Sequence, residues 1–532
     1  MWIAKNETLV DRRVNDIGIE VFVLVVILSL AAYFRFYHLS DKPGWYSDEG
    51  TILEIVKHLS HGSIQYMAIN QSTLLAARLP LFPLVLKWIM SIFGFGIETL
   101  RMTTASLGVL DVLILSLVLR RIMGFDGRWF AYVAGFGLAI FPKAIFYNRL
   151  GFSYNLLTPL ILLAWFGGWR YLTDDNKYWL GISALAIGIG GVSDLMMFSM
   201  VLPFFLIVLS RNWRDLRWSL PILLIPLGIY AGIMLLTVPS AFIFDLKFIL
   251  LRMGSIPAHL QLPLITLNLG ALFTWDAWIL AGMVGLFLLW PNRLRRLTIL
   301  FFFAPVILLG RTTGLVGFGF YYLSPLLPFI ALGVSTLIWR GTPYVLSFFT
   351  DALHAFLSDM GIDPSLWVSR RLSVILVSLS SFFIAFSPLI VSLVLTNNDI
   401  STGYETFLSD VLIDAKNARE ALTMINKLIE PEDLVIASPA LIWGINGRTS
   451  DFQITLAFEG KRTEHFPDDI PRDRFAYDPS LESARYVIVD PIWRNWAAKA
   501  MPEVEKMMRS VEEWPLVYQA GEISIYRNPD IQ

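Results

Sequence analysis

The chain has 532 residues, of which 55% are hydrophobic and only 16% charged. No soluble core buries that much apolar surface, so the composition predicts a polytopic membrane protein. The net charge is −1, which provides no overall field to attract nucleic acid. Cysteine is absent, and this excludes disulfides, thiolate metal sites and cysteine nucleophiles.

The first long apolar run covers residues 17–37 and follows Arg12 and Arg13. About 20 apolar residues are enough to cross a bilayer as a helix. No small-residue cleavage site follows the run, so we expect an anchor that stays in place and no removable signal peptide.

Residues 38–101 are predicted to form the first outer loop. The loop is amphipathic, with one helical stripe beginning at Ile52 and another over residues 81–93, where Pro83 and Lys87 interrupt the apolar pattern. We expect helices that lie in the membrane interface. If residues 81–93 instead crossed the membrane, the later basic clusters would move to the side opposite Arg12 and Arg13.

The remaining apolar runs bring the expected number of spans to about eleven. They cover residues 102–119, 130–147, 154–169, 179–192, 195–209, 220–238, 270–290, 297–310, 315–339 and 372–395. Basic clusters such as Arg120 and Arg121 follow the inward-going spans, so the positive-inside rule predicts a cytoplasmic N-terminus. The first outer loop and everything after Thr396 are then extracytoplasmic.

After residue 396 the composition changes to short alternating stretches. The pattern predicts a helix over 408–429, strands over 434–437 and 486–489, a helix over 504–511, and a hairpin of 515–518 with 523–526. The chain is therefore expected to be mainly α. A transmembrane helical domain, 1–396, precedes a small extracytoplasmic α/β domain, 397–532.

The first outer loop carries an acidic pair, Asp48 and Glu49, directly after Trp45, Tyr46 and Ser47. In one interpretation Ser47 is a helix N-cap and the carboxylates merely favour the first turn. In the other, the aromatic faces pack against a sugar ring. An ionised carboxylate would then take a proton from an acceptor hydroxyl, orient that acceptor or hold a divalent cation. Local sequence leaves both open.

Six basic residues lie at outer ends of spans or in outer loops, where topology gives them no reason to be. They are Arg78, Arg101, Arg149, Lys247, Arg252 and Arg311. Arginine forks match phosphate oxygens, and lipid phosphates lie at this depth. Snorkelling to ordinary head groups explains any one of them alone. As a set beside a carboxylate pair they favour an anionic lipid substrate.

The order of these features resembles the GT-C superfamily of membrane glycosyltransferases, in the branch of protein O-mannosyltransferases and lipid A aminoarabinose transferase. The matching motifs are Asp48-Glu49, Arg78-Leu79-Pro80-Leu81-Phe82, Phe141-Pro142, Asn148-Arg149 and Tyr322-Leu323-Ser324-Pro325-Leu326-Leu327-Pro328. The resemblance implies inverting transfer, on the outer face, of a sugar from a polyprenyl-phosphate donor to a lipid, glycan or protein acceptor.

Carried over by position, Asp48 is the acceptor-activating base and Glu49 its partner. Arg78 and Arg149 contact the donor phosphate, and Arg252 and Arg311 are further phosphate candidates. The expected substrate cavity comprises Trp45, Tyr46, Asp194, Tyr321 and Tyr322. No cofactor is firmly implied, and a divalent cation on Asp48 and Glu49 stays open.

Three positions depart from the family pattern and leave the sugar unnamed. Tyr154 and Tyr321 stand where relatives often have charged residues, and Asp194 stands in place of a lysine. Asp194 is either a second acidic site or a helix cap. Two other functions compete: a transporter or flippase of a lipid-linked sugar, and a glycan-binding scaffold. The scarcity of mid-membrane charge, Asp111 being an exception, argues against transport.

Overall fold

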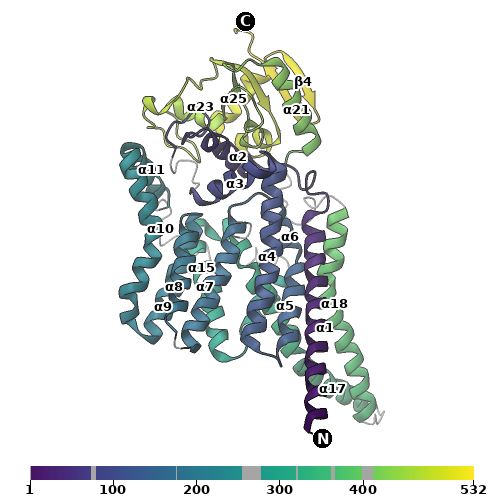
Figure 1. Ribbon diagram of the computed structural model, residues 1–532. Helices are drawn as coiled ribbons and strands as arrows, with labels where there is room; N and C mark the ends of the chain where they lie inside the picture. The colour runs from purple at the N-terminus through teal and green to yellow at the C-terminus, as the bar shows by residue number, and fades with distance from the viewer. Residues whose placement is uncertain are drawn as a thin grey trace.

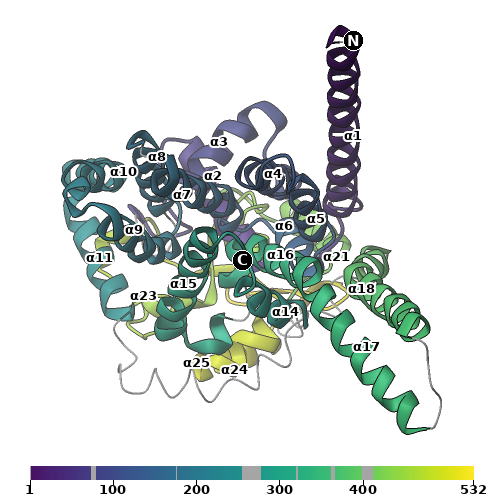
Figure 2. The ribbon, with the colours of Figure 1, turned by 90° about the horizontal axis from the view of Figure 1, so that it is seen from below.

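The computed structural model describes residues 2–72, 79–174, 176–253, 277–318, 321–360, 366–397 and 411–531. A bundle of helices carries an α/β domain at one end, and the N-terminus lies at the opposite end (Figure 1). We call these the domain end and the far end of the bundle. Figure 2 shows the first part of α1 (Trp2–Phe36), and α17 (Thr342–Asp359) together with α18 (Leu366–Asn397), standing apart from the rest of the bundle.

Most helices of the bundle follow the predicted apolar runs; the exceptions are the helices Pro239–Met253 and Thr342–Asp359, which lie between predicted spans. In chain order they are α1 (Trp2–Phe36), α4 (Ile97–Met123), α5 (Arg128–Ala139), α6 (Pro142–Arg149), α7 (Tyr154–Asp174), α8 (Tyr178–Gly191), η1 (Leu195–Met200), α9 (Val201–Arg211), η2 (Trp213–Asp215), α10 (Leu216–Thr237), α11 (Pro239–Met253), α14 (Ala277–Leu286), α15 (Asn292–Phe318), η3 (Tyr321–Leu326), α16 (Leu327–Thr336), η4 (Leu337–Gly341), α17 (Thr342–Asp359) and α18 (Leu366–Asn397).

Among the described residues, four helical stretches are long and apolar enough to cross a membrane: Ile17–Phe36, Ile97–Met123, Trp213–Thr237 and Tyr322–Asp359. A fifth is possible if α5 and α6, which are bent by 57° at their junction, count as one span. Pro142 begins α6 and lacks the N–H that would continue α5, which explains the break. The larger number of eleven spans therefore stays a prediction, and residues 270–276 of one predicted span lie outside the described residues.

Two helices of the first outer loop, α2 (Ser47–Ser60) and α3 (Leu81–Phe93), lie between the bundle and the α/β domain (Figure 1). With 13 residues, α3 is too short to cross a bilayer. It buries Phe82 and Leu86 but exposes Trp88 and Phe93. This fits the predicted interfacial position.

The prediction that Ser47 caps α2 was wrong, because Ser47 is already helical and Tyr46 is the N-cap. The cap instead comes from Glu49, whose Oε2 accepts the backbone N–H of Tyr46 at 3.1 Å. A carboxylate three residues into a helix commonly reaches back in this way.

The C-terminal domain contains a five-stranded sheet in the order β2-β1-β3-β5-β4. The strands are β1 (Leu434–Ile436), β2 (Arg448–Ser450), β3 (Ala484–Val489), β4 (Leu516–Ala520) and β5 (Ile523–Arg527). The first three are parallel, and β5 pairs antiparallel with both β3 and β4. The helices are α21 (Ala415–Leu428), α22 (Pro439–Ile442), α23 (Phe452–Phe458), η5 (Arg472–Arg474), η6 (Trp493–Ala497), α24 (Ala498–Ala500) and α25 (Pro502–Glu512).

The predicted strands and the hairpin are confirmed, and Gly521 turns the hairpin with a φ of +56°. The predicted first helix begins later than expected, at Ala415, although residues 408–410 lie outside the described residues.

The domain sits directly on the first outer loop. Trp45 and Ile413 exchange two backbone hydrogen bonds of 2.7 and 2.9 Å. These bonds pair the backbone of the first outer loop with that of the C-terminal domain. Arg474 of the domain forms an ion pair of 3.2 Å with the buried Asp245 on α11. A single cluster of buried apolar side chains runs through both parts. The contact is therefore part of the folded core.

Candidate active site

The two carboxylates of the acidic pair have different environments. Glu49 is buried and forms a two-pronged ion pair with the buried Arg101, with distances of 2.7 and 2.8 Å. Its Oε1 also accepts the backbone N–H of Gly151 at 2.8 Å, and its Oε2 accepts that of Tyr46. Both oxygens of Glu49 are thus occupied, which suits a residue that holds the site together better than one that moves protons.

Arg101 and Arg149 fix the backbone that leads into the first outer loop by donating hydrogen bonds to its carbonyl groups. Arg101 also donates to the carbonyls of Pro43 at 2.7 Å and Gly44 at 2.8 Å. Arg149, fully buried at the end of α6, donates to the carbonyls of Phe34 at 2.8 Å, Lys42 at 2.9 Å and His38 at 3.3 Å. These bonds fix the residues that lead into α2, and so fix where α2 begins.

Asp48 is half-buried in the first turn of α2. Of the two carboxylates, that of Asp48 is therefore the more accessible.

Residues 150–154 connect α6 to α7 and include Tyr154, the first residue of α7; this segment joins the predicted site residues. The ring of Phe152 lies 5.6 Å from that of Tyr46 and 6.0 Å from that of Tyr154. Ser153 donates its hydroxyl to Asp194 at 3.0 Å. Gly151 is required here, because a Cβ at this position would lie 2.4 Å from Leu100. Apart from Tyr154, sequence reasoning missed this segment, and the only local indication was a glycine two residues after Arg149.

The row of aromatic rings continues to η3. The rings of Tyr154 and Tyr322 lie 5.6 Å apart in an edge-to-face arrangement. Tyr46, beside Asp48, is thus connected through Phe152 and Tyr154 to Tyr322. The structure therefore brings together Tyr46, Asp194 and Tyr322 from three distant parts of the chain. The side chain of Tyr321 lies outside the described residues.

Asp194 is a helix cap, which was one of its two interpretations. Its Oδ1 accepts the backbone N–H of Met196 at 3.0 Å at the start of η1. The side chain is buried, and its other oxygen accepts from Ser153. Asp194 thus fixes the 150–154 segment.

Trp45 is predicted to line the substrate cavity, but its ring is 2% exposed and packs against Trp443 of the C-terminal domain at 5.3 Å. In this position Trp45 contributes to the contact between the first outer loop and the C-terminal domain.

Of the predicted phosphate ligands, Arg78 and the side chains of Arg252 and Arg311 lie outside the described residues. Their contact with a donor phosphate stays a prediction. Arg149 directs its donors to backbone carbonyls, as described above, and Lys247 is exposed on α11.

The described residues contain no group of three or more His, Cys, Asp or Glu side chains that could hold a metal ion. Because both oxygens of Glu49 already accept from Arg101, the acidic pair is a poor chelate in this arrangement. Asp48 alone would have to anchor a cation together with substrate oxygens.

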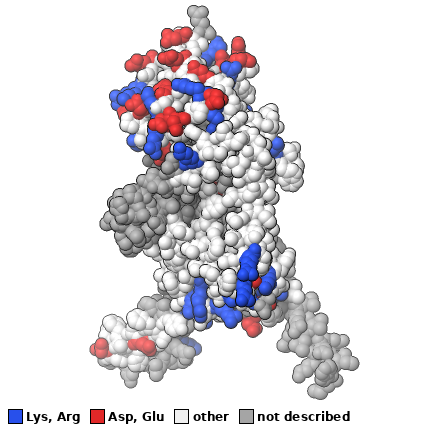
Figure 3. Space-filling model, turned by 90° about the vertical axis from the view of Figure 1, so that its left-hand side faces the viewer, with Lys and Arg blue, Asp and Glu red and all other residues white. Residues whose placement is uncertain are grey.

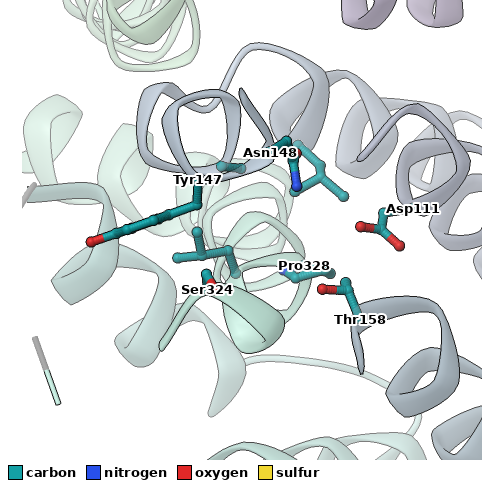
Figure 4. A pocket seen from close by; sticks show the side chains of 9 residues that line it. Asp111, Tyr147, Asn148, Thr158, Ser324 and Pro328 are labelled. Carbon is teal, nitrogen blue, oxygen red and sulfur yellow. The ribbon is translucent and has the colours of Figure 1, made fainter. Parts of the chain in front are cut away.

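A narrow cavity lies within the bundle below this site (Figure 4). Its lining is Asp111, Leu138, Ala144, Tyr147, Asn148, Thr158, Ser324, Leu327 and Pro328. Asn148 is held by Arg35, which donates to it at 2.9 Å. Asp111, the mid-membrane acid noted in the sequence, therefore faces a polar pocket inside the bundle and does not face lipid.

Comparison with known families now adds to this geometry. Residues 77–242 match the model of the family described as dolichyl-phosphate-mannose-protein mannosyltransferase. The resemblance to membrane glycosyltransferases of the GT-C superfamily, stated from the sequence motifs, is confirmed. No curated protein matches the chain in sequence.

Solved structures narrow the similarity to one architecture. The chain aligns with ArnT from Cupriavidus metallidurans bound to undecaprenyl phosphate, with a TM-score of 0.61 and 13% identity over 96% of this chain and 98% of that one. The apo state of the same protein aligns equally well, over 98% and 99%. The similarity to AglB from Archaeoglobus fulgidus is lower, with a TM-score of 0.49, 14% identity and coverage of 92% and 72%. The chain therefore has the ArnT fold over nearly its whole length.

Proposed function

We propose that this chain is an integral membrane glycosyltransferase that transfers a sugar from a polyprenyl-phosphate-linked donor to an acceptor, with inversion at the anomeric carbon. The observation that carries the proposal is the half-buried Asp48 beside a rigid Glu49–Arg101 pair, at the junction of the bundle and the C-terminal domain. The family match and the ArnT fold support the reaction class. The ArnT structure bound to undecaprenyl phosphate supports a polyprenyl-phosphate donor.

The chemistry that fits this site is a single displacement. Asp48 takes the proton of the acceptor hydroxyl as the oxygen attacks the anomeric carbon, and the bond from that carbon to the phosphate oxygen breaks. The polyprenyl phosphate leaves with the bonding electron pair and needs no proton. Arg78, together with Arg252 and Arg311, is proposed to stabilise the charge on the departing phosphate.

The orientation we propose puts the N-terminus in the cytoplasm and the active site and C-terminal domain outside it. Lys and Arg gather at the far end of the bundle, whereas the middle of the body has few charges (Figure 3). This distribution supports the orientation through the positive-inside rule.

The direct test replaces Asp48 with Asn, which keeps the size of the side chain but removes the base. Membranes containing wild type or Asp48→Asn are supplied with a radiolabelled polyprenyl-phosphate sugar and candidate acceptors. We expect at least a hundredfold slower transfer in the variant, the usual contribution of a general base. Glu420→Gln, at an exposed position on α21, is the matched control with unchanged transfer. Equal rates in wild type and Asp48→Asn would refute the role of Asp48.

A further inference from the structure

A second hollow lies at the far end of the bundle, between α7, α9 and α15. Its volume is about 480 Å³, and its lining is Leu172, Leu206, Ile207, Ser210, Arg211, Arg293, Arg296, Leu297 and Leu300. One wall is thus apolar, and three arginines from two helices converge at the mouth. Tyr154 of the proposed active site lies at the other end of α7.

The described residues do not balance the charge of Arg293 and Arg296. Arg293 and Arg296 are exposed and have no ion-pair partner among the residues that the structure describes. Both lie in the first turns of α15, where the helix dipole adds further positive potential. Arg211 is half-buried and held over the ring of Tyr171 at 4.6 Å, which orients its guanidinium.

Nearby acids are already engaged by other basic residues. Asp215 accepts an ion pair from Lys177 at 3.0 Å and a hydrogen bond from Tyr171 at 2.8 Å. Asp174 pairs with Arg170. Arg293 and Arg296 therefore present donors to a ligand that comes from outside the protein.

We propose that this hollow binds an anionic glycerophospholipid of the leaflet at the far end. An acyl chain would lie along Leu206, Leu297 and Leu300, and the head-group phosphate would accept hydrogen bonds from Arg293 and Arg296. Arginine forks match phosphate oxygens, and basic pockets between membrane helices favour anionic head groups. Such a site would bind the lipid independently of the transfer reaction.

The test titrates the purified full-length chain with dioleoyl phosphatidylglycerol and, separately, with dioleoyl phosphatidylcholine, and counts bound lipid by native mass spectrometry. The double variant Arg293→Ala, Arg296→Ala removes the phosphate donors, and Leu300→Trp fills the apolar part without changing charge. Arg214→Ala, Arg217→Ala is the matched control, because it removes two exposed arginines of the same end that do not line the hollow.

We expect the wild type and the control to prefer phosphatidylglycerol over phosphatidylcholine. In both test variants the affinity for phosphatidylglycerol should fall by about tenfold or more, the loss of at least one charge-assisted contact. Unchanged melting temperatures establish that the variants are folded. The proposal is overturned if the control loses the preference equally, if the two lipids bind alike, or if inorganic phosphate or undecaprenyl phosphate displaces phosphatidylglycerol at equal concentration.

Discussion

Glu49 and Asp48 are adjacent in sequence but differ in what they can do. Glu49 accepts four hydrogen bonds, two of them from Arg101, and both side chains of this pair are fully buried. Removing one partner of a buried ion pair leaves an uncompensated charge, which is far more costly than losing an exposed pair. The two carboxylates can therefore be separated by experiment.

Glu49→Gln is expected to lower the free energy of unfolding by about 3 kcal/mol, because Arg101 stays buried without its counter-charge. Thermal unfolding of the purified protein in detergent measures the change. The control is Glu98→Gln, which breaks the exposed 3.5 Å pair with Arg419 and should cost less than about 1 kcal/mol. Asp48→Asn should leave the melting temperature unchanged. A Glu49→Gln protein as stable as wild type would contradict the conclusion that Glu49 holds the site together through Arg101.

At the scale of elements, α2 is placed by the C-terminal domain as much as by the bundle. Gly50 lies against α22 so closely that a Cβ would fall 1.7 Å from the carbonyl oxygen of Pro439. Lys57, further along α2, donates to the carbonyl of Ile445 at 2.9 Å. The helix that carries Asp48 is therefore in contact with both the bundle and the C-terminal domain.

Gly50→Ala is expected to push α22 away from α2, because neither backbone can yield without moving a whole element. We expect faster hydrogen exchange at the amides of residues 439–445 and reduced transfer. Gly228→Ala, in α10 with open space around its Cβ, is the control and should change neither. Unaltered hydrogen exchange in Gly50→Ala would show that α2 and α22 are packed less tightly than described.

A buried acid, Asp490, lies directly after β3 and just before the helical turn that follows it. Its carboxylate accepts the hydroxyl of Ser438 and the backbone N–H groups of Ile492 and Trp493. Burial nevertheless raises the pKa of Asp490 to about 6, above its ordinary value of 3.8. The folded chain then binds this proton more tightly than the unfolded chain does.

The raised pKa of Asp490 determines how its contribution to stability changes with pH. The contribution of Asp490 to stability is fully present below pH 3.8 and is lost as the pH rises to about 6. We compare thermal unfolding of the full chain and of Asp490→Asn at pH 4, 5, 6 and 7, so that other titrating groups cancel. The stability of wild type relative to the variant should fall across this window. A difference that is flat or that rises with pH would contradict the shift.

Elements were more predictable from the sequence than their contacts. Long apolar runs predict the helices of the bundle, since about 20 apolar residues have few other stable arrangements in a membrane protein. Alternation predicts β1, β3 and the hairpin. The strand β2 has three residues and carries no periodicity, so it was missed. The break between α5 and α6 could have been expected from Pro142.

At the scale of the whole molecule, the site depends on contacts that sequence patterns do not contain. The pairing of Arg101 with Glu49 spans 52 residues, and Gly151 reaches Glu49 across 102. Motif order alone marked Arg101 and Arg149 as phosphate candidates or family positions. Only the fold shows that both hold the outer loop, and that the C-terminal domain covers the acidic helix.

The C-terminal domain is joined to the bundle and to the helix that carries Asp48. It shares a core with the bundle and is joined to α2 at Trp45, Gly50 and Lys57 and to α11 through Arg474 and Asp245. An acceptor that reaches Asp48 therefore approaches at the junction of the two parts. If the protein is a glycosyltransferase, it must make a glycosidic product and not merely move a lipid-linked sugar.

Proteoliposomes provide the measurement that separates these outcomes. Purified protein is reconstituted with a labelled polyprenyl-phosphate sugar and acceptor, and mass spectrometry follows the free polyprenyl phosphate and the glycosylated product, while label crossing the bilayer is counted in parallel. The account predicts equal amounts of product and released polyprenyl phosphate in wild type and neither in Asp48→Asn. Translocation of intact lipid-linked sugar without any glycosidic product would contradict it.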